Sequence, residues 1–547
     1  MKNLLKIVSA VVLGLSVVAC SSANKMAEMA ENVIVECNPS VLEVVAGNID
    51  EFVAVTYPDG YFHPKAILEV TPVIVYEGGE AAGAPLYYQG EKVKDNYKVV
   101  SSKGSTVSDR VSIPYKEGME KSHLELRGVV TLKGKTVTLP TKKVADGANT
   151  TYMLVKKGGY YSLKADGYQE IIKQTEEGQI LYSINSATVT NSQLKGQSIK
   201  DFLAALDEVN ANERKTVTST EVVAYASPDG GQKLNSKLSD SRSESAKKAW
   251  NTVTKGHDAA APEVKSIGQD WEGFQELVSK SNIEDKDLIL RVLSMYSDPA
   301  VRESEIKNMS EIYKELKGGV LPELRRARFI ANVEYKNFTS EELVELINAN
   351  SDVLDETALL RAATLVDDSA KKINIYNKAV EKFNSDAARF NIGVVYLNDG
   401  KDAQAKSAFA KVQTKDADLK NVQGVLALRA GDLAGAAKLF AESGTAEAKA
   451  NQGVVDILGG NYAKAAAELA DAPGCCHNTV LAYILNKQLD KAAAASKCQS
   501  PEVQYLNAII AARQGKSADV AKYLELAGKD ASLKARAAKD IEFAAFK

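Results

Sequence analysis

Residues 391–409, which read NIGVVYLNDGKDAQAKSAF, decide the fold of the C-terminal part of the chain. Within them Gly393 precedes Gly400 by seven residues, and Phe409 follows nine residues later. The same order returns twice along the sequence, as Gly424, Gly431 and Phe440 and then as Gly453, Gly460 and Leu469. Ala, Leu, Lys, Asp and Glu dominate this region, and these residues favour helix or its ends. The self-similarity predicts an all-α solenoid of helix hairpins over residues 338–547.

Small residues mark the turn inside each hairpin. Gly400, Gly431, Gly460 and Gly515 take this place, with Asn486 in the equivalent position, at spacings of 31, 29, 26 and 29 residues. The pattern is similar to that of the tetratricopeptide family, in which a small residue stands where two helices pack closely and the period is about 34. The units here are shorter and lack the Trp and Pro of the consensus.

The resemblance to tetratricopeptide repeats implies a superhelix, because one hairpin cannot bury its apolar face alone. Stacked hairpins create an extended concave surface, and the functional interpretation is a groove that docks a peptide or a protein, here another envelope protein. The alternative is a helical stalk with a purely architectural role.

A second informative stretch, residues 224–243, reads AYASPDGGQKLNSKLSDSRS. It resembles the core of OmpA-like peptidoglycan-binding domains, which have a strand, a Gly-containing turn, an Asn, and then Leu-Ser and Arg on the following helix. Gly230 and Gly231 permit a tight turn. Asn235 and Ser239 lie one helical turn apart, where both can hydrogen-bond the loop backbone. Arg242 carries a fixed fork of donors that suits a carboxylate.

The resemblance implies four peptidoglycan-binding residues, Ser227, Asp229, Asn235 and Arg242. In the family, the Arg and an Asp of the preceding loop hold the carboxylate and ammonium of diaminopimelate. Here Ser227 stands where that Asp belongs, and Asp229 lies two residues away. The alternative for Arg242 is a structural salt bridge with Asp229 or Glu244. The resemblance covers about residues 180–337, with a helical insertion over 281–318, in a predicted α+β domain at 156–337.

Residues 33–155 have the pattern of a β-sheet domain. Residues 66–76 and 124–132 are rich in β-branched side chains with partial alternation, and turn signals such as Pro58-Asp59-Gly60 separate the runs. Several short strands with these turns predict a β-sandwich of immunoglobulin-like type.

The first nineteen residues have the parts of a secretory signal peptide: two lysines, an apolar run and a small residue before a break. Val17-Val18-Ala19-Cys20 resembles the lipobox of bacterial lipoproteins, which implies lipidation of Cys20 and a lipidated linker over residues 20–32. Surface-exported lipoproteins of the Bacteroides group carry acidic residues just after this Cys, and residues 21–25 have none. We therefore expect the periplasmic face of the outer membrane.

The composition excludes some partners. The formal net charge is −3, and it becomes about −5 without Lys2 and Lys6, which argues against nucleic acid as a partner. Besides Cys20 and Cys37, Cys475, Cys476 and Cys498 cluster late in the chain. In an oxidising periplasm one of the adjacent pair can bridge to Cys498, and free buried thiols are the alternative. Without a Cys-x-x-Cys pattern or a His cluster, we expect no metal or cofactor.

The sequence offers no residue set that favours an enzyme, since four histidines form no triad and no phosphate loop opens a helix. The expected function is a lipid-anchored scaffold that binds the wall peptide through the OmpA-like domain and a protein through the repeats. The alternative is an accessory subunit of an outer-membrane assembly, secretion or fimbrial machine that does not bind the wall.

Overall fold

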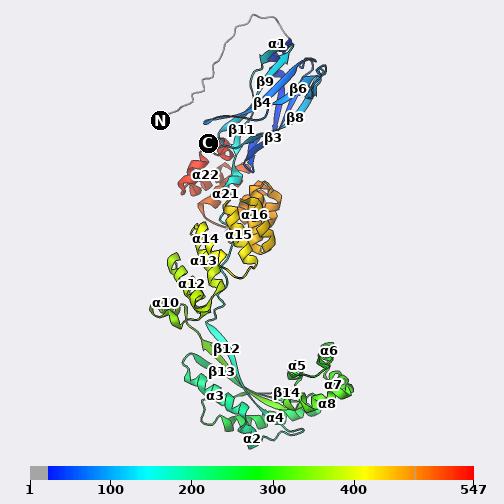
Figure 1. The fold of residues 1–547 in the computed structure, drawn as a ribbon, viewed down its shortest axis with the longest axis vertical. Coiled ribbons are helices and arrows are strands. Elements are labelled where there is room, and N and C mark those ends of the chain that lie inside the picture. The colour runs from blue at the N-terminus through cyan, green and yellow to red at the C-terminus, as the bar shows by residue number, and fades with distance from the viewer. Residues whose placement is uncertain (1–21, 475, 547) are drawn as a thin grey trace. The chain divides into compact units, whose positions relative to one another are not determined.

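The computed structural model describes residues 22–474 and 476–546. It divides into two compact units, one made of the chain up to Lys164 together with Asp386 onward, and the other of Ala165–Ser385 (Figure 1). We call these the first and the second unit. The signal peptide, Cys20 and Cys475 lie outside the described residues. None of the helices within the described ranges has the length and apolar character needed to cross a membrane.

The first unit begins with a short helix and a β-rich region. Its elements are α1 (Ser22–Glu28), β1 (Ile34–Asn38), β2 (Val41–Val45), β3 (Asn48–Tyr57), β4 (Ile67–Tyr76), β5 (Gly79–Ala82), β6 (Leu86–Gly90), β7 (Lys98–Val100), β8 (Ser105–Pro114), β9 (Ser122–Leu132), β10 (Lys135–Thr138) and β11 (Lys142–Asn149). The strands pair in the order β1-β3-β2-β11-β9-β4-β6-β7, and β8 also pairs with β3. The predicted strands at 66–76 and 124–132 are β4 and β9, which pair antiparallel along their length.

Alternating side chains bury one face of each strand, as the period of two requires. On β9, Leu124, Leu126, Val130 and Leu132 are buried between more exposed neighbours. Val55 and Tyr57 of β3 and Leu68 and Val70 of β4 line a small apolar cavity in the core of this region. The predicted β-rich class is confirmed, and the immunoglobulin-like topology stays a prediction.

The second unit contains a four-stranded sheet in the order β12-β15-β13-β14. Its strands are β12 (Ile171–Leu181), β13 (Lys215–Ala226), β14 (Glu263–Gln269) and β15 (Arg326–Lys336), with helices α2 (Asn191–Leu194), α3 (Gln197–Ala211) and α4 (Gln232–Val253). Phe202 of α3, Trp250 of α4 and Phe329 of β15 pack with ring centroids 5.3–6.3 Å apart. The α+β character predicted for this region is present.

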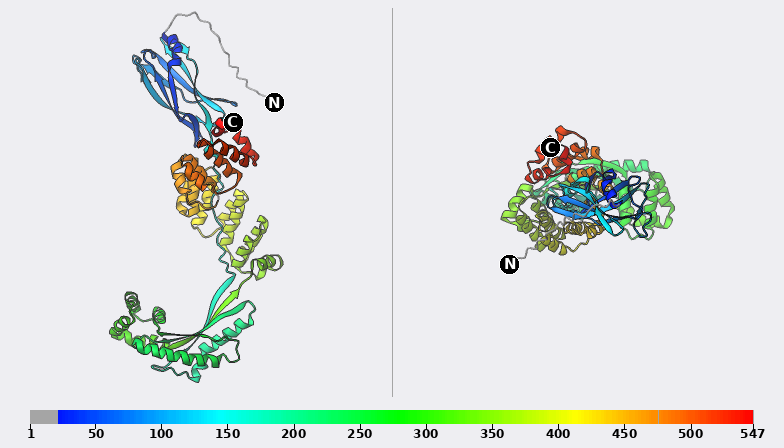
Figure 2. Two further views of the ribbon diagram at one scale, coloured as in Figure 1. Left: turned by 180° about the vertical axis from the view of Figure 1, so that it is seen from behind. Right: turned by 90° about the horizontal axis from the view of Figure 1, so that it is seen from above.

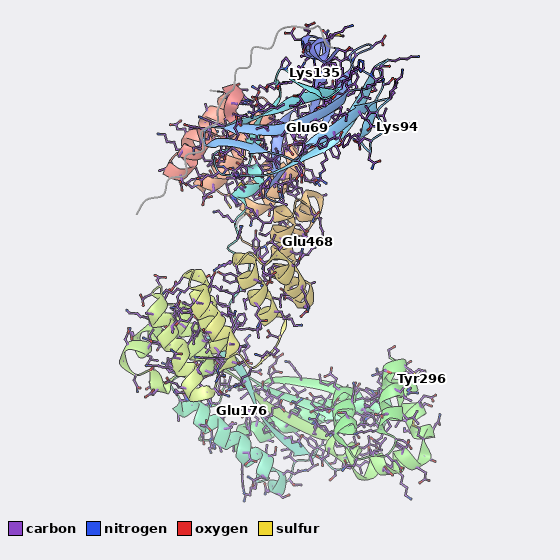
Figure 3. All side chains as sticks on the ribbon, turned by 45° about the horizontal axis from the view of Figure 1, so that its top comes forward. Glu69, Lys94, Lys135, Glu176, Tyr296 and Glu468 are labelled. Atoms are coloured by element: carbon purple, nitrogen blue, oxygen red, sulfur yellow. The ribbon has the colours of Figure 1, made fainter. Side chains whose placement is uncertain are left out.

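Strand β12 begins earlier than the sequence predicts. The alternation of Ile180, Tyr182 and Ile184 in the sequence predicts a strand that begins near residue 180, but the pairing with β15 runs from Ile171 to Leu181. Residues 173–177 of β12 are polar, and Glu176, labelled in Figure 3, lies among them on the edge of the sheet. A polar edge strand lacks the apolar alternation by which a strand is recognised.

Helices also follow β14, as the sequence predicts for residues 281–318. These are α5 (Trp271–Lys280), α6 (Lys286–Met295), α7 (Pro299–Asn308), α8 (Ser310–Gly318) and α9 (Val320–Glu323). They have an apolar core of their own, which includes Phe274, Val278, Ile289 and Leu316. The second unit ends with α10 (Ser340–Ala349), α11 (Glu356–Thr364) and α12 (Ser369–Phe383).

The rest of the first unit is a series of helix hairpins. The helices are α13 (Asp386–Asn398), α14 (Asp402–Ala410), α15 (Ala417–Arg429), α16 (Leu433–Ser443), α17 (Ala446–Leu458), α18 (Tyr462–Glu468), α19 (His477–Leu485), α20 (Leu489–Ala495), α21 (Pro501–Arg513), α22 (Ser517–Ala527) and α23 (Ala531–Ala537). Glu468, labelled in Figure 3, ends α18. The predicted helical-repeat class is confirmed for this part of the chain.

The predicted turn residues are mostly where the backbone needs them. Gly400, Gly431, Gly460 and Gly515 have φ between 68° and 85°, which glycine adopts without a Cβ penalty. The assignment of Asn486 was wrong by one residue, because Lys487 takes the left-handed conformation with φ 58°. Asn adopts the left-handed conformation more readily than Lys, so the sequence pointed to Asn486 although the adjacent lysine adopts it.

The glycines at the helix contacts are explained by close packing. A Cβ on Gly393 would lie 2.4 Å from the Phe409 ring, and one on Gly424 would lie 2.5 Å from the Phe440 ring. Gly453 meets Leu469 in the same way at 2.6 Å. These are the pairs that the sequence repeats. The repeat pattern therefore arises from the close contact between the two helices of each hairpin.

Candidate functional site

A row of buried asparagines runs across the hairpins. Asn391, Asn421, Asn451 and Asn478 lie on α13, α15, α17 and α19, the first helices of four successive hairpins, and each is at most 5% exposed. A buried carboxamide costs free energy unless its donors and acceptors are paired. We call these four residues the asparagine row.

The partner of the row is a segment of the same chain. Residues 155–164, which we call the strap, follow the β-rich region and pass along the hairpins (Figure 2). Asn451 accepts from the Tyr160 N–H at 2.7 Å and donates to the Tyr160 carbonyl at 2.8 Å. Asn421 donates to the same carbonyl at 2.9 Å.

The pairing repeats every four residues of the strap. The Lys156 N–H and carbonyl pair with Asn478 at 2.9 Å each, and those of Lys164 pair with Asn391 at 2.8 and 3.3 Å. The strap therefore runs antiparallel to the order of the hairpins. Each of these three asparagines serves one residue of the strap as a neighbouring strand would, by satisfying both its main-chain groups.

Carboxylates hold the two ends of the strap. Lys156 Nζ lies 2.7 Å from Glu502, and Lys164 Nζ lies 2.6 Å from Asp416 and also contacts Asp418. The hydrogen bond from Lys156 lowers the pKa of Glu502 to about 2. Burial works against the charge of Lys164, but its hydrogen bonds to the two aspartates outweigh it and raise the pKa of the lysine.

Free space remains beside the strap, on the surface of the hairpins that the strap covers, which we call the groove. A cavity of about 510 Å³ is lined by strap residues, including Tyr160 and Tyr161, and by Glu447 and His477 of the hairpins. His477 Nε2 lies 2.7 Å from the Leu154 carbonyl, and burial lowers the pKa of this histidine, which favours the neutral ring. Within the described residues no cluster of His, Cys, Asp and Glu suits a metal ion.

The β-rich region is also bonded directly to the last helices. Asn149 and Thr151 each donate to Glu542 at 2.8 Å, and Glu542 is paired with Arg513 at 2.5 Å. Gly147, with φ 65°, packs against Ile541 so closely that a Cβ would lie 2.8 Å away. The β-rich region and the hairpins are therefore in direct contact, and the strap adds further contacts between the two parts of the first unit.

In the second unit, the 224–243 stretch forms the end of β13, a loop and α4. Asn235 is buried and donates to the carbonyls of Ser227 and Gly230, at 2.9 and 2.7 Å. Ser239 instead accepts from the Gly268 N–H at 3.0 Å, so it secures the end of β14. Asn235 thus has the loop-binding geometry expected for it.

Arg242 is fully buried, and its guanidinium is occupied. It donates to the main-chain carbonyls of Ser186, Tyr225 and Ser183 at 3.0, 2.9 and 3.4 Å. Its hydrogen bonds go to these carbonyls rather than to Asp229 or Glu244. Burial lowers the pKa of Arg242 to about 10, so it remains charged at neutral pH.

The loop residues of the expected wall site contact each other and the inserted helices. The Ser227 hydroxyl donates to Asp229, and Ser227 itself is buried. Between Asp229 and the side chains of Trp271, Glu303 and Tyr313 the cavity is only about 10 Å³, at most the room of one water molecule. The inserted helices thus cover the loop in which the OmpA-like resemblance places the binding site.

Two of the late cysteines lie together. The Sγ atoms of Cys476 and Cys498 are 3.0 Å apart. Burial raises the pKa of the Cys476 thiol and disfavours its thiolate. Cys37 is distant in sequence, on β1, where burial raises its pKa to about 11.

The asparagine row is the feature that glycine spacing alone does not reveal. Asn391 and Asn451 stand nine residues before the turn glycine of their hairpins, Asn478 stands nine before Lys487, and Asn421 stands ten before Gly431. This recurrence is a signal in the sequence. The strap has no comparable signal, because it is short and pairs with the asparagine row through its main chain.

Solved structures similar to this chain include a tetratricopeptide repeat protein from Parabacteroides merdae ATCC 43184, at 12% identity and TM-score 0.29, covering 37% of this chain and 91% of that one. Another is the APC/C hetero-tetramer Cut9-Hcn1, at 13% and 0.30, covering 60% and 77%. A third is YrrB, a tetratricopeptide repeat protein with an unusual peptide-binding site, at 16% and 0.20, covering 37% and 100%. No family model and no curated protein matches the sequence.

Proposed function

We propose that this chain is a polypeptide-binding scaffold of the bacterial envelope, with a binding rather than a catalytic role. The observation that carries the proposal is the asparagine row, whose carboxamides pair with both the N–H and the carbonyl of three residues of an extended chain. Main-chain pairing of this kind binds polypeptide with little dependence on sequence. The helix hairpins supply the concave surface on which it occurs.

The location belongs to the same proposal. The lipobox at residues 17–20 supports attachment of Cys20 to the outer membrane, and the absence of acid in residues 21–25 supports the periplasmic face. A diacylglycerol with an added acyl chain provides the two anchoring signals that stable attachment needs. The partners are then the membrane through this lipid and another envelope protein through the scaffold.

Wall binding is the second candidate function. The geometry of Arg242 argues against it and favours a role without wall binding. Arg242 is fully buried and three of its five N–H groups already donate to carbonyls, so a diaminopimelate carboxylate does not reach the guanidinium without displacing the loop. Releasing it would leave those carbonyls unpaired in a buried place. We therefore favour an accessory role in an outer-membrane assembly, secretion or fimbrial machine, with the α+β domain serving protein assembly.

Co-sedimentation separates these two candidates. The chain from Ser21 onward is mixed with purified diaminopimelate-type peptidoglycan, with and without free diaminopimelate, and centrifuged. We expect the protein to remain in the supernatant. Pelleting that free diaminopimelate competes away would contradict the proposal and restore the wall tether, and release of soluble wall fragments would contradict the non-catalytic role.

The scaffold itself is tested on the lipidated full chain. Detergent extracts of the envelope should yield it with a second polypeptide in a constant molar ratio across two purification steps. The Cys20→Ala variant should lose the membrane and keep that polypeptide. Recovery of the lipidated chain alone under mild extraction would contradict the scaffold role.

A further inference from the structure

We propose that the strap is an exchangeable internal ligand, and that the groove it fills takes an extended basic segment of a partner protein. This inference rests on the proposed scaffold function and names the partner chemistry of the same groove. The asparagine row recognises main chain, and the strap meets it at residues 156, 160 and 164. Any extended segment without proline at those positions can make the same bonds.

Charge defines the class of segment. Glu502 lies at one end of the groove, and Asp416 and Asp418 lie at the other. In the strap they hold Lys156 and Lys164, eight residues apart. The carboxylates at both ends of the groove attract a basic segment. They exclude an acidic segment, because its carboxylates would be repelled by those of the groove. The partner segment therefore carries Lys or Arg at this spacing.

The hairpins cover the side chains of the strap only in part. After Val155 none of its side chains is buried, and Leu163 is 41% exposed. Besides the main-chain hydrogen bonds and the two lysines, Arg429 donates to the Gly158 carbonyl and Ser162 donates to Glu447. The half-buried rings of Tyr160 and Tyr161 pack against the hairpin core. A tethered segment needs little intrinsic affinity, because its effective concentration is of millimolar order, about that of a short flexible linker.

The cavity of about 510 Å³ beside the strap gives a competitor an advantage. A segment with larger side chains can fill it between Glu447 and His477 while keeping the bonds to the asparagine row. The strap places Gly158 and Gly159 along this cavity and leaves it open. A partner segment thus gains contacts that the strap lacks, which is what displacement requires.

Gly159 provides a way to release the strap without altering the groove. Its φ is 86°, and a Cβ there would lie 2.6 Å from Val425 Cγ1 on α15. Gly158 is a matched control, because a Cβ on it meets nothing within 4 Å. The Gly159→Ala chain should therefore detach at the centre of the strap, and the Gly158→Ala chain should not.

The experiment titrates a fluorescein-labelled peptide of sequence VKKGGYYSLK, residues 155–164, into the full chain and follows anisotropy. We expect Gly159→Ala to bind it at least ten-fold more tightly than either the wild type or Gly158→Ala. The Lys156→Glu/Lys164→Glu peptide should bind at least ten-fold more weakly, and adding Asn451→Ala to Gly159→Ala should have a similar effect. Hydrogen exchange over residues 155–164 should accelerate in Gly159→Ala only.

Two outcomes overturn the proposal. Faster exchange of the strap without peptide binding would show that the groove does not accept an external segment, whatever the co-purification test of the scaffold gives. Unchanged exchange in Gly159→Ala would show that the strap is a fixed structural element. If this variant does not fold, wild-type exchange decides: the strap should exchange faster than α17, and exchange only together with α17 would overturn the proposal.

Discussion

Asn451 and Tyr160 are joined by two hydrogen bonds across 291 residues of sequence. The Asn451 carboxamide accepts from the Tyr160 N–H and donates to its carbonyl, and its Nδ2 also donates to Asn421 Oδ1 at 2.9 Å. The whole second unit lies in the chain between these partners. The first unit is therefore closed by contacts of very long sequence separation.

Asn451→Ala should destabilise the first unit. The change removes the hydrogen bonds that Asn451 makes with the Tyr160 N–H and with Asn421 Oδ1, at a cost of about 1–3 kcal/mol, while Asn421 still donates to the Tyr160 carbonyl. Hydrogen exchange over Ala446–Leu458 should accelerate. Both tryptophans, Trp250 and Trp271, lie in the second unit, so the fluorescence transition in guanidinium should not move.

The control for this change is Asn398→Ala. Asn398 is exposed and accepts a hydrogen bond from the Tyr161 hydroxyl, so its removal should leave exchange in α17 unaltered. Equal effects of the two variants would mean that the asparagine row has no special weight in the fold.

Gly424→Ala should also destabilise the first unit, although alanine has the higher helix propensity by about 1 kcal/mol. The new Cβ would lie 2.5 Å from the Phe440 ring, and overpacking of this kind costs about 1–3 kcal/mol. Thermal unfolding followed by circular dichroism should shift downward. Gly459→Ala, whose Cβ meets nothing nearer than 3.5 Å, should be neutral or stabilising. A stable Gly424→Ala protein would contradict the packing explanation of the repeated glycines.

The hairpins were predictable from sequence because they are local and periodic. Gly393 and Phe409 are sixteen residues apart and recur, so their contact can be inferred without knowing the rest of the fold. The partner of the groove was not predictable, because Tyr160 and Asn451 are far apart and no pattern connects them. The Arg242 motif was found, but its role depends on carbonyls at Ser183 and Ser186 that only the folded loop brings near. The preference of Asn for turns gave a wrong prediction at Asn486, because the adjacent Lys487 takes the left-handed conformation.

Glu51→Gln should change how the stability of the first unit depends on pH. Burial raises the pKa of Glu51 from 4.5 to about 7, while the Glu43 N–H, 2.7 Å away, favours the charged form less strongly. A carboxyl with a raised folded-state pKa is most favourable below its unfolded pKa, and stability falls as pH rises from 4.5 to 7. The penalty above pH 7 is about 3 kcal/mol.

Glutamine retains the acceptor for Glu43 and does not titrate. The variant should therefore be more stable than the wild type at pH 8 and similar to it at pH 4.5, with denaturation followed by circular dichroism at both. A stability difference that does not depend on pH would rule out Glu51 as the titrating group.

Cys476 and Cys498 should form a disulfide on treatment with diamide, a two-electron oxidant that takes up the two thiol protons and electrons. Their Sγ atoms are 3.0 Å apart, so little movement is needed. The bond would close a loop of about 20 residues and stabilise the protein by about 3 kcal/mol in the chain-entropy account. Mass spectrometry of proteolytic fragments should identify the cross-link, and Cys475→Ser should retain it. A cross-link through Cys475 in the wild type would contradict the assignment.

Arg242→Lys should destabilise the second unit without any requirement for a ligand. An ammonium on a flexible stem cannot reproduce the fork that serves the carbonyls of Ser186 and Tyr225, so buried acceptors lose partners at about 1–3 kcal/mol each. Trp250 is buried on the same helix, and its fluorescence transition in guanidinium should move to lower denaturant, while hydrogen exchange over α17 stays as it was. The exposed Lys247→Ala on the same helix is the control and should leave the transition in place. An Arg242→Lys protein with unaltered stability and altered sedimentation with peptidoglycan would show that the guanidinium serves the wall and not the loop.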